Sequence, residues 1–104
     1  MPKEYAPITP GEYLQHEYME PLGISQSQLS RDLDVPISRI NGILKGTRAI
    51  TADTALRLAE CFRTSPKMWL NLQQQYDIRV LKRTTWPSIQ PRIRPCVPPD
   101  DARV

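Results

Sequence analysis

The chain has 104 residues, two cysteines and a formal net charge of +3 at pH 7. This length suits one domain with a modest core, and no apolar run is as long as a membrane span or a signal-peptide core, so we expect a cytoplasmic protein with no membrane partner. Cys61 lies in a helical pattern and Cys96 in a proline-rich segment, which favours unpaired thiols in a reducing compartment.

The charge is unevenly distributed along the chain. Up to Val35 two Lys and Arg residues stand against six acidic residues, whereas from Pro36 onward twelve stand against five. This asymmetry predicts one surface directed at a polyanion, while the N-terminal third faces water or another protein.

The first helix has a clear predicted start. Residues 1–9 are expected to form a leader in which Tyr5 and Ile8 can touch the domain. Thr9-Pro10-Gly11-Glu12 then combines a Thr cap, a Pro at the first helical position and a Glu at the third. We expect the helix to end near Pro21.

One metal-site candidate lies on this first helix. Glu12, His16 and Glu20 are spaced four apart, so they share one helical face and could hold a metal ion. The sequence has a single histidine and no cysteine near it, which favours a solvated acidic face over a ligand set. We therefore predict no metal and no cofactor.

The segment from Ser25 to Gly46 predicts two helices folded across a tight turn. Ser25 and Gln28 form a capping box at the start of the first helix. Asp34 falls where the turn needs a left-handed residue, and Pro36 can be the first residue of the second helix. Gly46 can end that helix as a C-terminal cap. This is the layout of a helix-turn-helix, whose second helix enters a DNA major groove.

The second helix of this pair has an outward face without acidic residues. Placing Ile40, Ile43 and Leu44 in the core leaves six residues directed outward: Ile37, Ser38, Arg39, Asn41, Gly42 and Lys45. From 35 to 52 the chain has three cations and no carboxylate. A solvated face on an ordinary helical hairpin would explain any one of these residues, but DNA binding explains the whole run better.

The residue types in this face suit DNA. Asn41 can pair with adenine, Ser38 can bond to several bases, and Ile37 can touch a thymine methyl group. Three cations can contact phosphates: Arg39, Lys45 and Arg48. The predicted partner is therefore double-stranded DNA.

Two further helices are predicted beyond Gly46. Thr51 caps the fourth helix, and Asp53 in its first turn complements the helix dipole. Ser65 and Pro66 open the fifth helix in the way that Thr9 opens the first.

The fifth helix carries apolar residues on more than one side. One stripe contains Trp69, Leu72 and Tyr76, and a second set lies elsewhere: Leu70, Ile78 and Leu81. A helix of this kind must bury more than one face. The second face can bind a dimer partner or another protein, or the core can simply wrap the helix, and the sequence does not separate these cases.

Residues 84–104 form a proline-rich tail. Prolines recur at 87, 91, 95 and 99, so we expect irregular, disordered or polyproline-like chain rather than helix or strand. Trp86 and Ile89 nevertheless give the tail apolar anchors that could order on a partner surface.

From Pro10 to Asp77 the sequence resembles the HigA/VapI group of bacterial antitoxins, helix-turn-helix proteins of the xenobiotic-response-element class. Four segments carry the resemblance: Gly11-Glu12-Tyr13-Leu14, Gly46-Thr47-Arg48-Ala49-Ile50-Thr51, Ala55-Leu56-Arg57-Leu58-Ala59 and Trp69-Leu70-Asn71-Leu72-Gln73. Two positions depart from the group: Ser30 stands where Ala is usual, and Gly42 leaves a base-facing position without a side chain.

The resemblance implies a bacterial all-α protein with a five-helix lambda-repressor-like domain, here over residues 10–83. It implies a homodimer that represses a toxin–antitoxin operon and binds a HigB-like toxin, a ribosome-dependent mRNA nuclease. It also gives roles to single residues. Gln26 would contact the DNA backbone, and the others divide between bases (Ile37, Ser38, Gly42) and phosphates (Arg39, Lys45, Arg48).

Two functions are compatible with this sequence. The first is an autorepressing antitoxin, and the second is a repressor of the same fold without a toxin partner. An enzyme is disfavoured because the chain has one histidine, no glycine-rich phosphate loop and no nucleophile–base pair at recognisable spacing.

Overall fold

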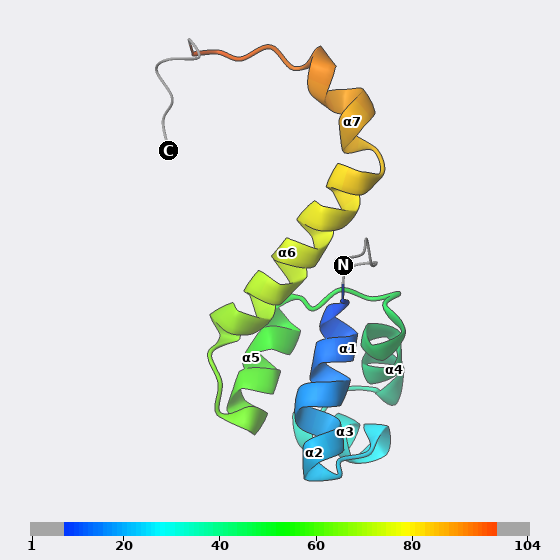
Figure 1. Cartoon of the computed structure of the whole chain (residues 1–104). Coiled ribbons are helices and arrows are strands. Elements are labelled where there is room, and N and C mark those ends of the chain that lie inside the picture. Colours follow the sequence, from blue (N-terminus) through cyan, green and yellow to red (C-terminus); the bar gives the residue numbers. More distant parts are fainter. Residues whose placement is uncertain (1–7, 98–104) are drawn as a thin grey trace.

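The structure, a computed structural model, describes residues 8–97 as helices and connecting loops with no strand among them (Figure 1). This confirms the predicted all-α class. The first predicted helix is continuous but has three parts: α1 (Pro10–Leu14), the π-helical η1 (Gln15–Met19) and α2 (Glu20–Leu22).

The start of α1 is the predicted capping box. The Glu12 N–H donates to Thr9 Oγ1 at 3.0 Å, and the Thr9 N–H donates to Glu12 Oε1 at 2.8 Å. The helix runs one residue past Pro21, because the π-helical turn before it widens the backbone where the proline ring would meet a carbonyl of the preceding turn. It ends at Gly23, whose φ is 66°.

The helix-turn-helix consists of α3 (Gln26–Leu33) and α4 (Ile37–Lys45). Asp34 has the predicted left-handed conformation, with φ 58°, and Gly46 ends α4 with φ 82°. Pro36 lies one residue outside the helix that it was predicted to begin, since its ψ of 145° is extended and α4 starts at Ile37.

Two longer helices complete the domain, α5 (Ala52–Phe62) and α6 (Pro66–Arg83). The predicted caps are confirmed: Thr51 Oγ1 accepts from the Thr54 N–H, and Ser65 Oγ accepts from the Lys67 and Met68 N–H groups. Counting the α1–η1–α2 rod as one helix, the part of the chain within 10–83 contains the five predicted helices.

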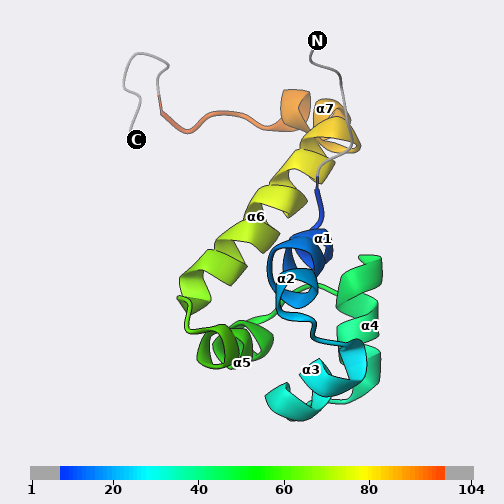
Figure 2. The same ribbon diagram turned by 60° about the horizontal axis from the view of Figure 1, so that its bottom comes forward.

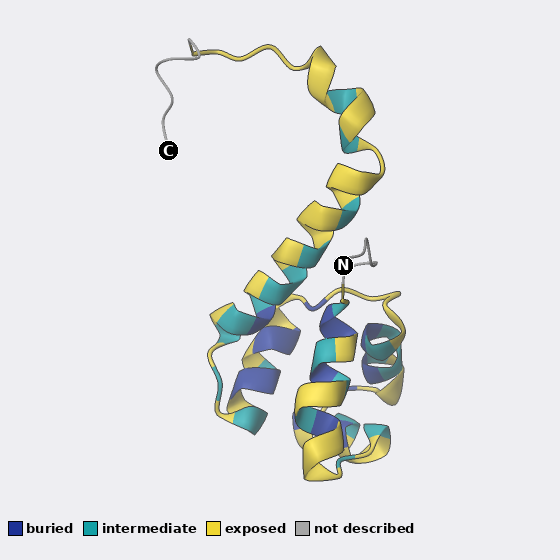
Figure 3. Cartoon of the chain, in the orientation of Figure 1, coloured by how far each residue is buried: buried dark blue, intermediate teal, exposed yellow. Residues whose placement is uncertain are grey.

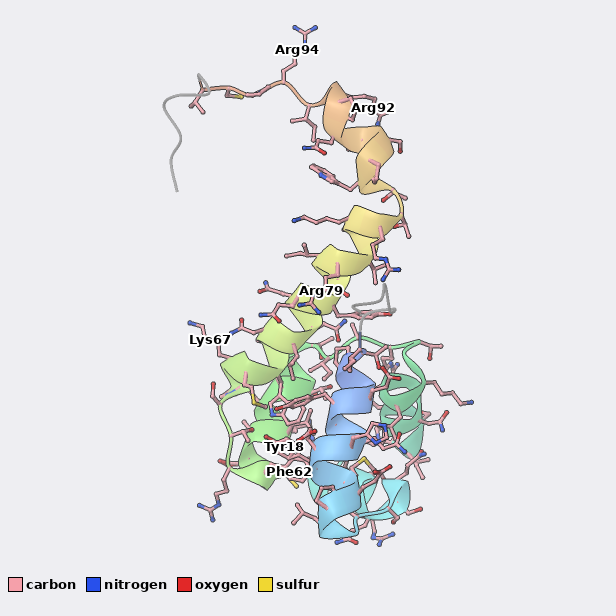
Figure 4. All side chains as sticks on the ribbon, viewed as in Figure 1. Tyr18, Phe62, Lys67, Arg79, Arg92 and Arg94 are labelled. Carbon is pink, nitrogen blue, oxygen red and sulfur yellow. The ribbon has the colours of Figure 1, made fainter. Side chains whose placement is uncertain are left out.

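The core lies where the α1–η1–α2 rod, α3, α4, α5 and the first half of α6 meet (Figure 3). Trp69 is fully buried there, and its Nε1 donates to Thr64 Oγ1 at 2.8 Å. Tyr18 and Phe62 lie beside it with ring centroids 4.9 Å apart (Figure 4). The core therefore joins the helix-turn-helix to the α1–η1–α2 rod before it and to α5 and α6 after it.

Helix α1 makes an unusually close contact with α4. A Cβ atom at Gly11 would overlap the Ile43 carbonyl oxygen and would lie 2.8 Å from Leu44 Cα. The absence of a side chain at this position lets α1 lie directly against the C-terminal half of α4.

The second half of α6 extends away from the other helices (Figures 1 and 2). Its apolar residues Ile78 and Leu81 are 53% and 51% exposed, whereas Trp69 in the first half is 0% exposed. The sequence left open whether the core covers the whole of α6 or leaves one face free for a partner. In the structure the core covers only the first half of α6.

The proline-rich tail is not wholly irregular. The prediction that no helix crosses it is wrong for 86–92, which form α7 (Trp86–Ile89) and a 3₁₀ turn, η2 (Gln90–Arg92). Pro87 and Pro91 each lie in a first turn, where the missing N–H has no helical partner to lose. Residues 93–97 are irregular, and residues 98–104, like the leader residue Tyr5, lie outside the described residues.

Candidate nucleic-acid interface

The predicted DNA-binding residues gather on α4 and its neighbours. Ile37 is 48% exposed at the start of α4, with Ser38 and Lys45 also exposed, while Ile40 and Ile43 are buried against the core. Four other predicted residues are half-buried: Gln26, Arg39, Asn41 and Gly42. The last, Arg48, is exposed on the loop that follows α4. Seven of the eight predicted residues therefore lie on α3 or α4, and Arg48 follows on the loop after α4.

Asn41 is bonded within the chain. Its amide Nδ2 donates to Gln26 Oε1 at 3.3 Å, and both side chains are half-buried. This bond ties the middle of α4 to the first residue of α3 and leaves the Gln26 amide nitrogen as a donor. The sequence predicts a direct contact of Asn41 with adenine, and the bond to Gln26 adds a contact within the chain that the sequence did not indicate.

Arg39 forms an ion pair that the sequence did not indicate. Its Nη1 donates to Asp53 Oδ2 at 2.6 Å, and Arg57 Nε donates to the same oxygen at 3.0 Å. The hydrogen bonds from Arg57 and Arg39 hold the pKa of the Asp53 carboxyl below its ordinary value. The sequence predicts only a helix-dipole role for Asp53, because no local pattern relates it to a residue on α4.

Arg57 extends this arrangement to the turn between the motif helices. Its Nη1 donates to the carbonyl oxygens of Leu33 and Asp34, at 2.8 Å and 3.1 Å. These are carbonyls at the end of α3, which have no partner within the helix. Helix α5 is therefore bonded to α4 through Asp53, and through Arg57 to the turn that sets the direction of α4.

Gly42 is enclosed by the loop that follows α4. The N–H groups of Thr47 and Arg48 both donate to the Gly42 carbonyl, at 2.9 Å and 3.1 Å. A Cβ atom at Gly42 would lie 3.1 Å from Arg48 Cβ, tighter than ordinary contact. The missing side chain thus lets Arg48 fold back toward the exposed end of α4.

The remaining chemical candidates lie away from this surface. His16 Nδ1 lies 3.2 Å from Glu20 Oε1, and residues 8–97 contain no group of three His, Cys, Asp or Glu residues that could hold a metal ion. Cys61 and Cys96 are free, and burial, with a smaller effect of Asp32, raises the pKa of the Cys61 thiol. Within the described part of the chain, no helix is long and apolar enough to cross a membrane.

A helix-turn-helix family model matches residues 16–69, which include both motif helices and α5. The sequence is 45% identical over 80 residues to virulence-associated protein I of Dichelobacter nodosus, covering 77% of this chain and 74% of that protein. The chain belongs to the HigA/VapI group of the helix-turn-helix family.

Solved structures of HigA proteins have the same fold. A HigA-family addiction-module antidote protein from Coxiella burnetii superposes with a TM-score of 0.81 at 44% identity, over 88% of this chain and 99% of that one. The antitoxin HigA of Pseudomonas aeruginosa, solved with the higBA promoter, superposes with a TM-score of 0.82 at 36% identity and the same coverage. This confirms the family and fold that the sequence motifs predicted.

Proposed function

We propose that this HigA/VapI-group protein is the DNA-binding antitoxin of a type II toxin–antitoxin module. It represses its own operon and neutralises a HigB-like mRNA-nuclease toxin. The observation that carries the proposal is the outward face of α4, which presents Ile37, Ser38 and Lys45 without any acid between 35 and 52. The promoter-bound HigA of Pseudomonas aeruginosa supports the same use of this fold.

The α4 surface supplies both kinds of DNA contact. Ile37 and Ser38 are exposed at the N-terminal end of α4, the end that reads base edges when such a helix enters the major groove. Gly42 has no side chain, so the loop that carries Arg48 packs directly on α4. Phosphate contacts come from four side chains: Gln26, which Asn41 supports, with Arg39, Lys45 and Arg48.

The active form is a homodimer built through the second half of α6. Two copies of α4 must face half-sites about one helical turn, roughly 34 Å, apart on the operator. The half-exposed Ile78 and Leu81 lie on the projecting part of α6, clear of α4, so they can pair two chains without blocking DNA. The dimer therefore joins two DNA-binding domains through their α6 helices.

The tail supplies the toxin contact. Trp86 and Ile89 on α7 are half-buried, and the tail also carries Arg92 and Arg94, which Figure 4 shows beyond the end of α6. An aromatic anchor with neighbouring cations suits a protein interface. In this division, residues 10–83 bind DNA and pair the chains, and 84–104 bind the toxin. The function consists of binding and includes no catalytic step.

A gel-shift assay tests the DNA-binding face. Replacing Lys45→Ala or Arg48→Ala should weaken binding to the promoter region of the chain's own gene and reduce the salt slope by about one unit per lost phosphate contact in each protomer. Lys67→Ala is the matched control, because Lys67 is an exposed cation at the start of α6, away from α4 (Figure 4). An unchanged slope in the α4 variants would show that DNA binds elsewhere.

The alternative function is a repressor without a toxin partner. Co-expression with the neighbouring open reading frame separates the two. An antitoxin rescues growth from that gene product and is captured with it, whereas a simple repressor binds the promoter but does neither.

A further inference from the structure

Arg39 and Arg57 share the Asp53 carboxylate but depend on it differently. Arg57 also donates to the carbonyls of Leu33 and Asp34, so its direction is fixed by the backbone. Among the described residues, Asp53 is the one side-chain partner of the Arg39 guanidinium, through Nη1 at 2.6 Å. Asp53 is therefore the tether of Arg39 and only one of several contacts of Arg57.

With Asp53 bonded to one side of its guanidinium, Arg39 can still bind a phosphate through its remaining N–H groups. A guanidinium has five N–H donors, and the Asp53 contact uses one of them. The Arg39 side chain is 29% exposed and that of Asp53 is 56% exposed, so the pair lies at the surface beside α4. The free N–H groups are thus held at a fixed place relative to the base-reading end of the helix.

We propose that Asp53 determines the specificity of DNA binding by tethering Arg39. This inference rests on the proposed function. In a correctly docked operator complex, a phosphate meets the pre-positioned N–H groups of Arg39 while the Asp53 contact stays in place. Non-specific complexes present phosphates at varied positions, which a tethered Arg39 cannot follow. The carboxylate therefore weakens non-specific binding more than operator binding.

The test compares Asp53→Asn with the unmodified protein on two DNA duplexes, the promoter region and a scrambled sequence of equal composition, over a range of salt concentrations. Freeing one cation per protomer should tighten binding to the scrambled duplex by about 3–10-fold and steepen its salt slope by about one unit per protomer. Promoter binding should change by less, so the ratio of the two affinities falls. Asp53→Glu keeps the charge and should restore much of the ratio.

Two controls separate the tether from a general charge effect. Asp32→Asn removes the same charge from a residue that lines the same surface recess as Asp53 but is bonded to neither arginine in the described structure. In a double-mutant cycle, Asp53→Asn should have little effect on the scrambled duplex once Arg39→Ala is present. Thermal melting of each variant verifies that it is folded.

The outcomes are distinct. If Asp53→Asn matches Asp32→Asn, or acts equally with and without Arg39, the tether is overturned although the protein still prefers its promoter. If Asp53→Asn does not fold, Asp53→Glu takes its place in the cycle. Support for the tether then requires two results: Asp53→Glu keeps the promoter-to-scrambled affinity ratio of the unmodified protein, and Arg39→Ala lowers that ratio. If the unmodified protein does not prefer the promoter, the proposed function itself fails.

Discussion

The two halves of α6 differ in how far the rest of the protein covers them. In the first half, Trp69 is fully buried among Tyr13, Tyr18 and Phe62, and its indole N–H is bonded to Thr64. In the second half, apolar residues of similar spacing are half-exposed. Apolar periodicity thus marks the faces that will be covered, but it does not tell whether the cover comes from the same chain.

The largest expected effect is in the buried half. Trp69→Ala should lower the free energy of unfolding by about 3–5 kcal/mol, because it removes a large side chain from a core that cannot close the space. Urea denaturation followed by circular dichroism measures this. Trp86→Ala on α7 is the matched control and should cost about 1 kcal/mol or less, as Trp86 is only half-buried. Equal losses would remove the distinction between the two regions.

The second effect is on association. Replacing Ile78 and Leu81 with Gln keeps good helix formers but removes the exposed apolar face of α6. The dimer dissociation constant, measured by sedimentation, should rise roughly 10–100-fold. Helix content should stay unchanged. Leu56→Gln is the control, because Leu56 is an exposed leucine on α5, at 61%. A dimer that survives the α6 change must use another surface.

A smaller effect is expected from shortening the tail. A chain ending at Arg83 lacks α7 and η2 but retains every residue of the core and of α4. Its promoter binding should fall by no more than about threefold, from the lost charges of Arg92, Arg94 and Arg103. Its affinity for the toxin, measured by calorimetry, should fall at least about tenfold. A chain ending at Val97 keeps α7 and serves as the control. Loss of DNA binding with intact toxin binding would reverse the assignment.

The smallest effect is a pH dependence confined to the packed region. The pKa of Asp53 is lowered by its arginine partners, so its contribution to stability is fully present above its ordinary pKa of 3.8 and is lost as pH falls through the lowered value. Thermal melting between neutral and strongly acidic pH should show this loss. Asp53→Asn should flatten that part of the profile, and the chain ending at Arg83 should retain it. A truncated chain that lost it would place the effect in the tail.

The features predicted correctly are those set by neighbouring residues. Thr9 with Glu12, Asp34 and Gly46 each determine a cap or turn within a few residues, and the structure has all three. The bonds Arg39–Asp53 and Asn41–Gln26 join residues 14 and 15 positions apart, so they depend on how the helices pack. No local pattern indicates them.

The prediction for residues 86–92 of the tail is wrong for a different reason. Proline was treated as excluding a helix wherever it occurs, but its effect depends on position, and Pro87 and Pro91 both lie in first turns. The sequence could not predict how much of α6 stays uncovered either, because this depends on where the other helices end rather than on α6 itself.

The contact at Gly11 sets the limits within which this protein can be re-engineered. Helix α1 lies on the Ile43 carbonyl because Gly11 has no side chain, so these two backbones have a single way of fitting together. The exposed Ile37 and Ser38, which we propose read the operator, can be exchanged without disturbing that fit. Transplanting the whole of α4 into another scaffold would succeed only if the recipient also offers a glycine at the matching place on its first helix.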